Sequence, residues 1–392
     1  MFMKKMHQWM RLLVFQRGVL WGLVLSIFCV GILCMPLPAH ADTLSVSAKS
    51  AVLMNAADGT LLWEKNAEEK LPMASTTKIM TALLTLEAAS VEDRVIDITD
   101  AMVRVEGSSM GLQAGDKVTL SALAKGMLCV SGNDAANAAA YALDGSLQAF
   151  AAHMNRRAAE LGLQNTHFVT PSGLDDDAHY TTASDLAKLA RAAMQNPAFA
   201  AITSQRTIEI PYVSPNVRRS FTNHNKLLAQ YPGCIGVKTG FTKKAGRCLV
   251  SCAERNGVRL IAVTLNAPDD WADHKTMLDY GFAQLHSVQL DDSSFTQSLP
   301  VVGAAQQTVS VHGAKGPAVV VPTNAVVQRE VQLPRFVYAP LEDGRVVGRV
   351  LYRVGSQVVG ETALTADAVP QQEPPKKSFW ESFLAFLKGS SG

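Results

Sequence analysis

Two turn signals far apart in the chain enclose a long alanine-rich region, and this arrangement restricts the possible folds. Asp58-Gly59 lies between apolar runs within residues 50–64, and Asn256-Gly257 lies between the apolar runs 248–252 and 258–265. Such pairs between apolar runs predict β-hairpins. Helical periodicity occurs between them, over residues 76–88, 120–128, 134–143 and 146–161, and a last helix, 270–282, would cover the sheet with Trp271, Met277 and Leu278. We therefore expect one domain in which strands from both ends form a sheet and helices pack against it.

The composition changes after about His286, where valine-rich runs separated by turns replace the helical patterns. The expected strands are residues 308–312, 318–321, 330–338 and 345–354. About 350 residues remain after the leader described below, which exceeds the usual size of one core and favours two domains. We predict a first domain at 42–286 and a small all-β domain at 287–367, which carries no catalytic cluster and is interpreted as a spacer or docking module. A Pro- and Gln-containing linker follows at 368–375.

The N-terminus has the pattern of a secretory leader. Lys4, Lys5, Arg11 and Arg17 precede or flank an apolar run at 18–34, and Ala39-His40-Ala41 provides a small-residue cleavage site before Asp42. We predict a signal peptide at 1–41 and an exported protein. The alternative is an uncleaved membrane anchor, because the apolar run is near the length needed to span a bilayer.

The rest of the chain gives no indication of a nucleic-acid partner, a metal or a cofactor. The whole chain has a net charge of +2, and the leader carries four basic residues and no acidic one, so the exported part is slightly acidic. The exported part contains four cysteines, Cys129, Cys234, Cys248 and Cys252, and their spacing matches neither a disulfide framework nor a zinc site. No two histidines have the spacing of a pair of metal ligands. We expect mostly buried thiols, no metal and no cofactor.

The C-terminal segment 376–389 has the pattern of an interfacial helix. Its aromatic and leucine residues fall on one helical face and lysines lie at both ends; the apolar face contains Phe379, Trp380, Phe383, Phe386 and Leu387. Such a segment is expected to lie in a membrane surface. The alternative is a helix that docks on its own domain.

Three short strings supply the parts of a serine acyl-transfer site. In Ser75-Thr76-Thr77-Lys78, the serine and lysine lie one helical turn apart and share a helix face, so the amine can accept the hydroxyl proton. Ser131-Gly132-Asn133 adds a hydroxyl for proton relay and an amide for the substrate, and Lys238-Thr239-Gly240 adds a positive charge for a carboxylate. Each string alone is weak, but this order of SxxK, Ser-x-Asn and KTG is a known set.

With these strings, the chain resembles the low-molecular-mass penicillin-binding proteins of the D-alanyl-D-alanine carboxypeptidase type, serine peptidases of the SxxK acyltransferase superfamily. Residues 165–174, 179–185 and 223–228 are similar to segments typical of that family, although Thr170 stands where members usually have Asn. The resemblance implies an α+β fold: a β-lactamase/transpeptidase-like domain with a five-stranded antiparallel sheet and helices on both faces, then a small all-β domain and a C-terminal amphipathic helix.

The resemblance also implies the reaction and the roles of the residues. The substrate would be the peptidoglycan stem ending in D-Ala-D-Ala, with Ser75 as nucleophile, Lys78 as base and Ser131 as proton relay. Asn133 would hold the substrate amide, Lys238 and Thr239 the terminal carboxylate, and Gly240 would allow close approach of the strand. The backbone N–H groups of Ser75 and Phe241 would form the oxyanion hole. His179, Asp185 and Asn225 are expected to be structural.

The implied partners are β-lactam antibiotics as covalent inhibitors and the membrane surface, through the terminal helix. The enzyme would act at the outer face of the cytoplasmic membrane, or secreted to the cell wall or periplasm. A class A β-lactamase is disfavoured, because residues 155–185 contain only Glu160 and no ExxLN string for deacylation. A D,D-endopeptidase that cleaves cross-links and a penicillin-binding sensor without turnover remain as alternatives.

Overall fold

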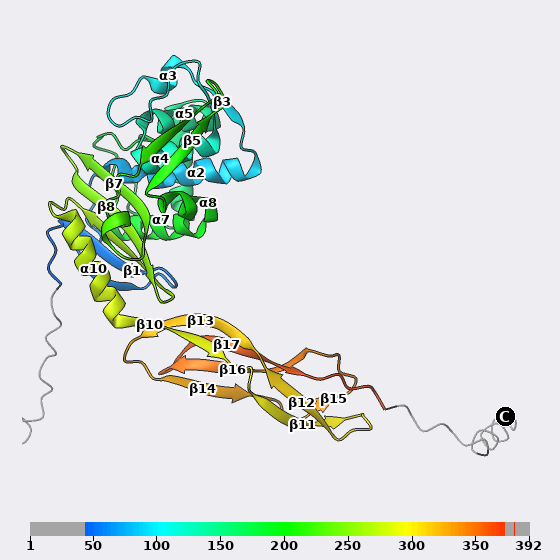
Figure 1. The fold of residues 1–392 in the computed structure, drawn as a ribbon. Coiled ribbons are helices and arrows are strands. Elements are labelled where there is room, and N and C mark those ends of the chain that lie inside the picture. Colours follow the sequence, from blue (N-terminus) through cyan, green and yellow to red (C-terminus); the bar gives the residue numbers. More distant parts are fainter. Residues whose placement is uncertain (1–43, 373–379, 381–392) are drawn as a thin grey trace, which may run out of the picture. The chain divides into compact units, whose positions relative to one another are not determined.

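The computed structural model describes residues 44–372 and Trp380, and its first architectural feature is a five-stranded sheet (Figure 1). The sheet order is β2-β1-β9-β8-β7, and every neighbouring pair is antiparallel. The strands are β1 (Ser50–Asn55), β2 (Leu61–Lys65), β7 (Cys234–Thr242), β8 (Gly246–Arg255) and β9 (Val258–Leu265). The predicted antiparallel five-stranded sheet is therefore confirmed, and β7 lies at one edge of it.

Both predicted hairpins are present. The β1–β2 turn contains Gly59 at φ +85°, and the β8–β9 turn contains Asn256 at φ +49° and Gly257 at φ +78°. A two-residue hairpin turn with positive φ at both positions fits the right-handed twist of the flanking strands. These turns fix which strand residues face each side of the sheet.

Helices cover both faces of the sheet (Figure 1). Helix α10 (Asp270–Gln284) packs on one face, where a Cβ atom at Gly281 would lie 2.7 Å from the Leu260 side chain. The alternate strand residues Val52 and Val263 belong to the core on the other face, with α2 (Lys78–Val91) and α7 (Ala183–Gln195). Further helices complete this layer: α4 (Leu120–Val130), α5 (Asn133–Asp144), α6 (Leu147–Glu160) and α8 (Pro197–Thr203).

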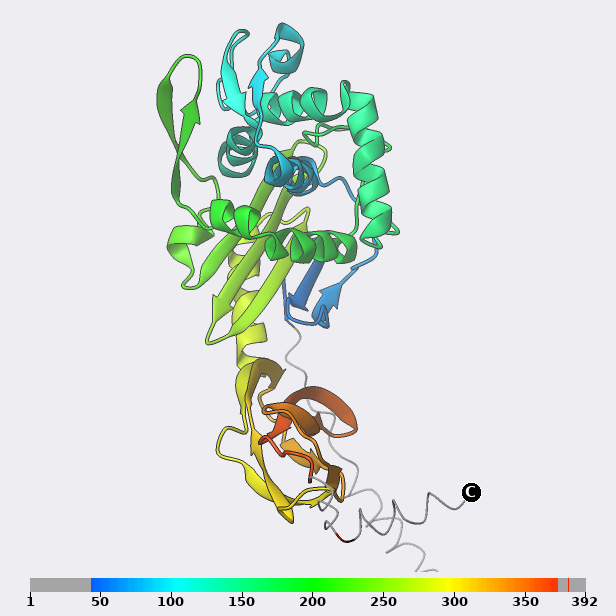
Figure 2. The same ribbon diagram turned by 90° about the vertical axis from the view of Figure 1, so that its right-hand side faces the viewer.

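Short elements surround these layers. They are the 3₁₀ turn η1 (Ala74–Thr77), α3 (Asp100–Val103), α9 (Leu227–Gln230), and the paired strands β3 (Val95–Asp97) with β4 (Lys117–Thr119) and β5 (Thr207–Tyr212) with β6 (Val217–Thr222). Figure 2 shows the β5–β6 ribbon extending beside the helices, in green. The helix expected at 76–88 is divided between η1 and α2, and this division places Ser75 on the tighter turn.

Residues 285–366 form strands, and residues 285–372 contain no helix. β10 (Leu285–Asp291) pairs with β13 (Lys315–Pro322), and a six-stranded sheet has the order β14-β16-β17-β12-β11-β15. Its strands are β11 (Thr296–Val302), β12 (Thr308–Gly313), β14 (Val327–Gln332), β15 (Val337–Tyr338), β16 (Arg345–Val354) and β17 (Gln357–Ala366). The strand expected at 330–338 is thus two separate strands. The buried Asp292 carboxylate accepts hydrogen bonds from Arg329, Tyr352 and Thr362.

The predicted leader and nearly all of the predicted terminal helix lie outside the described residues. Within the described part of the chain, no helix is long and apolar enough to cross a membrane. Cys129, Cys234, Cys248 and Cys252 are free thiols, and all but Cys234 are buried, in agreement with the sequence analysis.

Candidate active site

The Ser75 hydroxyl and the Lys78 amine meet at the start of α2. Lys78 Nζ lies 3.0 Å from Ser75 Oγ and donates a second hydrogen bond to the Ser172 carbonyl at 2.6 Å. The 3₁₀ turn brings residues i and i+3 onto one side, which explains this pairing. Lys78 is fully buried, whereas Ser75 is partly exposed. A buried amine within hydrogen-bond distance of an accessible hydroxyl is the geometry of a nucleophile and its base.

Electrostatics favour a neutral Lys78. Burial lowers its pKa well below the usual value, the charge of Lys238 lowers it further, and Asp134 opposes the shift. Burial also lowers the pKa of Lys238, to about 7. Burial and the second amine therefore both favour the deprotonated form of Lys78, whose lone pair a proton acceptor needs.

The second string lies between two helices. Ser131 ends α4 in the left-handed conformation, at φ +63°, and Asn133 begins α5. Asn133 Nδ2 donates to the Glu106 carbonyl at 2.6 Å, but Ser131 Oγ and Asn133 Oδ1 are buried without a hydrogen-bond partner among the described residues. Buried polar atoms rarely stay unpaired, so two such atoms in one three-residue string are candidates for binding a ligand.

The third string lies on the edge strand β7. A Cβ atom at Gly240 would lie 3.1 Å from Ser75 N and from Thr76 N, so the missing side chain allows β7 to approach the nucleophile turn. Lys238 is only 1% exposed, and its amine donates to the Thr239 carbonyl at 2.8 Å. Lys238 is therefore covered, whereas Thr239 is accessible to a ligand.

A cavity of about 350 Å³ lies over these groups. Its lining comprises Ser75, Ser108, Ser131, His224, Lys226, Thr239, Gly240, Phe241, Arg247, Asp270 and Trp271. Five of the eight residues predicted for the site line it, and Lys78, Asn133 and Lys238 do not. A larger hollow, of about 870 Å³, lies against β14 and β16, but its lining contains neither a nucleophile nor a base of this kind.

Sequence reasoning missed Arg247. Its guanidinium lies in the cavity wall, pairs with Asp270 (Nη2 to Oδ1 2.8 Å) and lies 5.7 Å from the centre of the Trp271 ring. Arg247 lies opposite Phe241 in the pairing of β7 with β8. Aligning these two strands as a hairpin in the sequence would have placed Arg247 next to the third string. Trp271, expected to cover the sheet, lines the cavity instead, because it lies at the first turn of α10.

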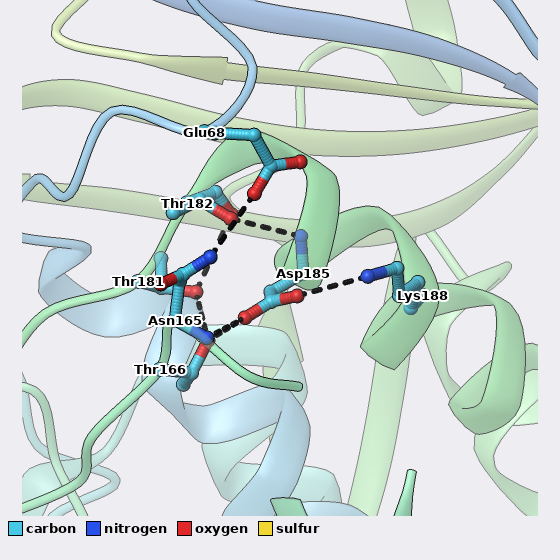
Figure 3. A network of polar contacts seen from close by, with 7 residues as sticks. All are labelled: Glu68, Asn165, Thr166, Thr181, Thr182, Asp185 and Lys188. Carbon is cyan, nitrogen blue, oxygen red and sulfur yellow. Dashed lines mark hydrogen bonds and ion pairs between the residues drawn. The ribbon is translucent and has the colours of Figure 1, made fainter. Parts of the chain in front are cut away.

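The segment before α7 is held by a network around Asp185 (Figure 3). The Asp185 carboxylate accepts hydrogen bonds from Asn165 N (2.7 Å) and Thr166 Oγ1 (3.0 Å), and it pairs with Lys188 at 3.1 Å. Thr182 caps α7 through the Asp185 N–H. None of these residues lines the cavity, and the network connects the start of α7 to residues 165–166, which precede the Ser172 carbonyl that holds Lys78.

The comparisons with known proteins agree with this geometry. A family model described as D-alanyl-D-alanine carboxypeptidase matches residues 37–269. The chain is 31% identical to the D-alanyl-D-alanine carboxypeptidase DacF of Bacillus subtilis over 95% of its own length and 97% of the relative. It is 36% identical over 265 residues to the D-alanyl-D-alanine carboxypeptidase of a Streptomyces strain, K15, which covers 63% of this chain and 91% of the relative.

Solved structures show the same fold. The D-alanyl-D-alanine carboxypeptidase DacD of Francisella tularensis superposes with a TM-score of 0.62 at 26% identity, covering 87% of this chain and 98% of that one. Penicillin binding protein 5 of Haemophilus influenzae gives a TM-score of 0.61 at 26% identity, covering 83% and 98%. With a family model that matches more than half of its length and a relative that matches nearly all of it, this chain belongs to the D-alanyl-D-alanine carboxypeptidase family.

Proposed function

We propose that this enzyme removes the terminal D-alanine from peptidoglycan pentapeptide stems through an acyl-enzyme on Ser75. The observation that carries the proposal is the 3.0 Å contact between Lys78 Nζ and Ser75 Oγ at the edge of a cavity. D-alanyl-D-alanine carboxypeptidase activity is common to the named relatives.

In the acylation step, Ser75 Oγ attacks the carbonyl carbon of the penultimate D-alanine and Lys78 accepts the hydroxyl proton. The N–H groups of Ser75 and Phe241 bind the oxyanion of the tetrahedral intermediate, and each such donor contributes about 3 kcal/mol in analogous sites. The C–N bond then breaks, and the departing D-alanine takes a proton relayed through Ser131. Water hydrolyses the Ser75 ester in the second step and regenerates the serine.

Binding of the substrate uses two kinds of polar group. Ser131 Oγ and Asn133 Oδ1 are buried without partners among the described residues, so we assign them to the substrate amide. Thr239 and Arg247 line the cavity and bind the terminal carboxylate, with Arg247 supplying the charge. Lys238 is 1% exposed, so we assign it an electrostatic role on Lys78 in place of direct contact with the carboxylate.

β-Lactams would acylate the same serine, because their strained amide reaches the site in place of the stem. A relative from Haemophilus influenzae is named a penicillin binding protein. The endopeptidase and sensor alternatives are not favoured, since the full-length relative is named a carboxypeptidase.

For location, we propose export through the leader 1–41 and attachment of the segment 376–389 to the outer face of the cytoplasmic membrane. The domain limits 42–286 and 287–367 and the linker 368–375 belong to the same proposal. The change from mixed helices and strands to strands alone near Leu285 supports it.

Mass spectrometry of a muropeptide digest tests the proposal. Incubation with residues 42–392 should convert pentapeptide stems to tetrapeptides with loss of one D-alanine, and Ser75→Ala should abolish both this loss and covalent labelling by penicillin. Cleavage of cross-linked dimers would indicate an endopeptidase, and stable labelling without any product would indicate a sensor. Labelling of Ser75→Ala would refute the nucleophile assignment.

A further inference from the structure

A chain of hydrogen bonds leads from a buried histidine to the peptide bond before Ser75. His179 is 3% exposed, and its Nε2 lies 2.8 Å from Thr77 Oγ1. Thr77 Oγ1 in turn donates to the Ala74 carbonyl at 2.8 Å. His179 does not line the cavity, and its hydrogen bond to the turn that carries Ser75 is made through Thr77.

The direction of these hydrogen bonds follows from the other side of the ring. The Val169 N–H donates to His179 Nδ1 at 2.9 Å, and the Thr170 N–H approaches the same atom at 3.3 Å. Because a backbone N–H can only donate, Nδ1 accepts and the ring proton is on Nε2. Burial lowers the pKa of His179 to about 4, which keeps the ring neutral. Nε2–H therefore donates to Thr77, and the Thr77 hydroxyl hydrogen is directed to Ala74.

The Ala74 carbonyl and the Ser75 N–H are the two ends of one peptide group. In a planar trans peptide these groups point in opposite directions, so fixing the carbonyl orients the N–H. A Cβ atom at Gly173 would lie 2.0 Å from Ala74 O, and one at Gly240 would lie 3.1 Å from Ser75 N. The peptide is thus held between the loop at Gly173 and strand β7, with its N–H on the β7 side.

This peptide also has an unfavourable conformation that must be maintained. Ala74 has φ +47°, a region that non-glycine residues seldom occupy and that costs about 1–3 kcal/mol. The hydrogen bond at its carbonyl adds to this packing, so its loss should let the peptide relax toward an ordinary conformation and turn the Ser75 N–H away from β7.

We propose that His179, acting through Thr77, is a positioning residue that aims the Ser75 N–H at the oxyanion. The two hydrogen bonds also polarise the Ala74–Ser75 peptide, because donation to Thr77 strengthens donation by its hydroxyl, and this makes the N–H a better donor. The inference rests on the proposed function, since it explains how one N–H group of the proposed oxyanion hole is kept in its orientation.

Matched substitutions separate this role from general support of the loop. Thr77→Val removes the hydroxyl and keeps the shape, whereas Thr77→Ser keeps the hydroxyl. His179→Asn keeps an acceptor near Val169 N–H but is too short to reach Thr77. Thr76→Val is the control, because Thr76 Oγ1 donates to the Met73 carbonyl at 2.6 Å in the same turn but acts on the preceding peptide.

Two measurements on the chain 42–392 test the inference: the rate of acylation by penicillin, and the infrared carbonyl band of the acyl-enzyme. Thr77→Val and His179→Asn should slow acylation about tenfold to a hundredfold, less than the loss of an entire donor. They should also move the carbonyl band to higher frequency, because the ester carbonyl receives a weaker hydrogen bond. Thr77→Ser and Thr76→Val should match the parent in both measurements, and the double variant Thr77→Val with His179→Asn should lose no more than either single variant.

The inference is overturned if Thr77→Val acylates within about twofold of the parent with an unshifted band, or if Thr76→Val shows the same band shift. If His179→Asn does not fold, the result for Thr77→Val alone decides the test. If the parent is acylated at a residue other than Ser75, the proposed function fails first. If the parent is acylated at Ser75 and Thr77→Val has the same acylation rate and carbonyl band as the parent, only the positioning role is refuted.

Discussion

The two lysines of the site are both buried, but they have different neighbours. Lys78 contacts Ser75, and Lys238 contacts the Thr239 carbonyl and does not reach the cavity lining. The charge of Lys238 lowers the pKa of Lys78, and the pKa of Lys238 is itself lowered to about 7. Lys238 thus influences the reaction through the ionisation of the base.

Lys238→Met should therefore change the pH profile of acylation as well as its rate. Removal of the positive charge raises the pKa of Lys78, so less of it is neutral at a given pH, and the acidic limb should move upward by about one pH unit. The shift should be largest below about pH 7, where the parent Lys238 is charged. Stopped-flow acylation by penicillin from pH 5 to 10 measures the limb.

Lys238→Arg is the control, since it retains the charge. The acidic limb of the pH profile of Lys238→Arg should lie at the same pH as that of the parent or at a lower pH, even if the rate of acylation falls. A limb that is unchanged in Lys238→Met would show that Lys238 has no electrostatic effect on the base.

Arg247 should determine the preference for a free carboxyl terminus. A guanidinium binds a carboxylate with two parallel hydrogen bonds, and an amide lacks the charge that strengthens them. The parent should prefer a peptide ending in D-Ala-D-Ala over its C-terminal amide, and Arg247→Gln should reduce this preference about tenfold or more, mainly by raising KM for the acid. Steady-state kinetics on both peptides provide the measurement.

Lys226, a second basic residue in the cavity lining, offers the matched control. Lys226→Gln should preserve the preference for the free acid. If the preference is lost in Lys226→Gln and kept in Arg247→Gln, Lys226 binds the carboxylate in place of Arg247.

At the residue level, the sequence predicted the parts of the site better than their contacts. The three strings come together, and five of the eight residues predicted for the site line the cavity. The burial of Lys238 and the presence of Arg247 and Trp271 depend on how β7, β8 and α10 pack, which no local pattern records. The His179–Thr77–Ala74 hydrogen bonds join residues about a hundred positions apart, so they were also beyond local reasoning.

Among the elements, those with a strong local signal were predicted best. Both hairpins formed where the Asp-Gly and Asn-Gly pairs indicated, because Gly59, Asn256 and Gly257 suit the positive φ that these turns require. Helix α7 was not predicted, although Thr182 caps it and its buried face includes Leu186, Leu189 and Ala190. Its apolar residues recur at helical spacing, so the sequence did contain a local signal for this helix. Ser75 was expected on an α-helix, but the positive φ at Ala74 starts a 3₁₀ turn.

The N-terminus of α5 organises the loop that borders the cavity. Asp134 accepts hydrogen bonds from Ser109 Oγ (2.6 Å), Met110 N (3.0 Å) and Leu112 N (3.0 Å). Asp134→Ala leaves these donors unpaired and should lower the free energy of unfolding by about 2–3 kcal/mol. It should also slow acylation, because the same loop carries Ser108 and the Glu106 carbonyl that holds Asn133. Chemical unfolding and penicillin acylation measure the two effects.

Asp93→Ala, which removes a similar carboxylate next to α4, is the matched control for Asp134→Ala. Asp93 likewise accepts from a backbone N–H and a hydroxyl, those of Ser121, at 2.8 and 2.6 Å. Its loss should lower stability and leave acylation unchanged. Equal effects of the two variants on acylation would show that Asp134 acts only through global stability.

At the level of the whole molecule, the sheet depends on residues from both ends of the catalytic region. β1 pairs with β9, so residue 50 lies opposite residue 265, and the site completes only when both segments are present. The strand region 285–366 has its own core, which includes Leu290, Val311, Val350 and Leu364. This separation of cores implies that changes near the C-terminus leave the chemistry of Ser75 intact.

Truncation after Gln372 should therefore separate attachment from catalysis. The chain 42–372 should release D-alanine from a soluble peptide within about twofold of the chain 42–392, but it should no longer sediment with vesicles containing phosphatidylglycerol. Within the full chain, Phe383→Glu places a charge on the predicted apolar face and should weaken sedimentation, whereas Ala385→Glu, on the opposite face of the predicted helix, should have a smaller effect. Undiminished sedimentation of 42–372 would show that the membrane contact lies elsewhere. If the truncated protein with its leader stays in the membrane fraction of cells while 42–372 does not bind vesicles, the leader is the anchor.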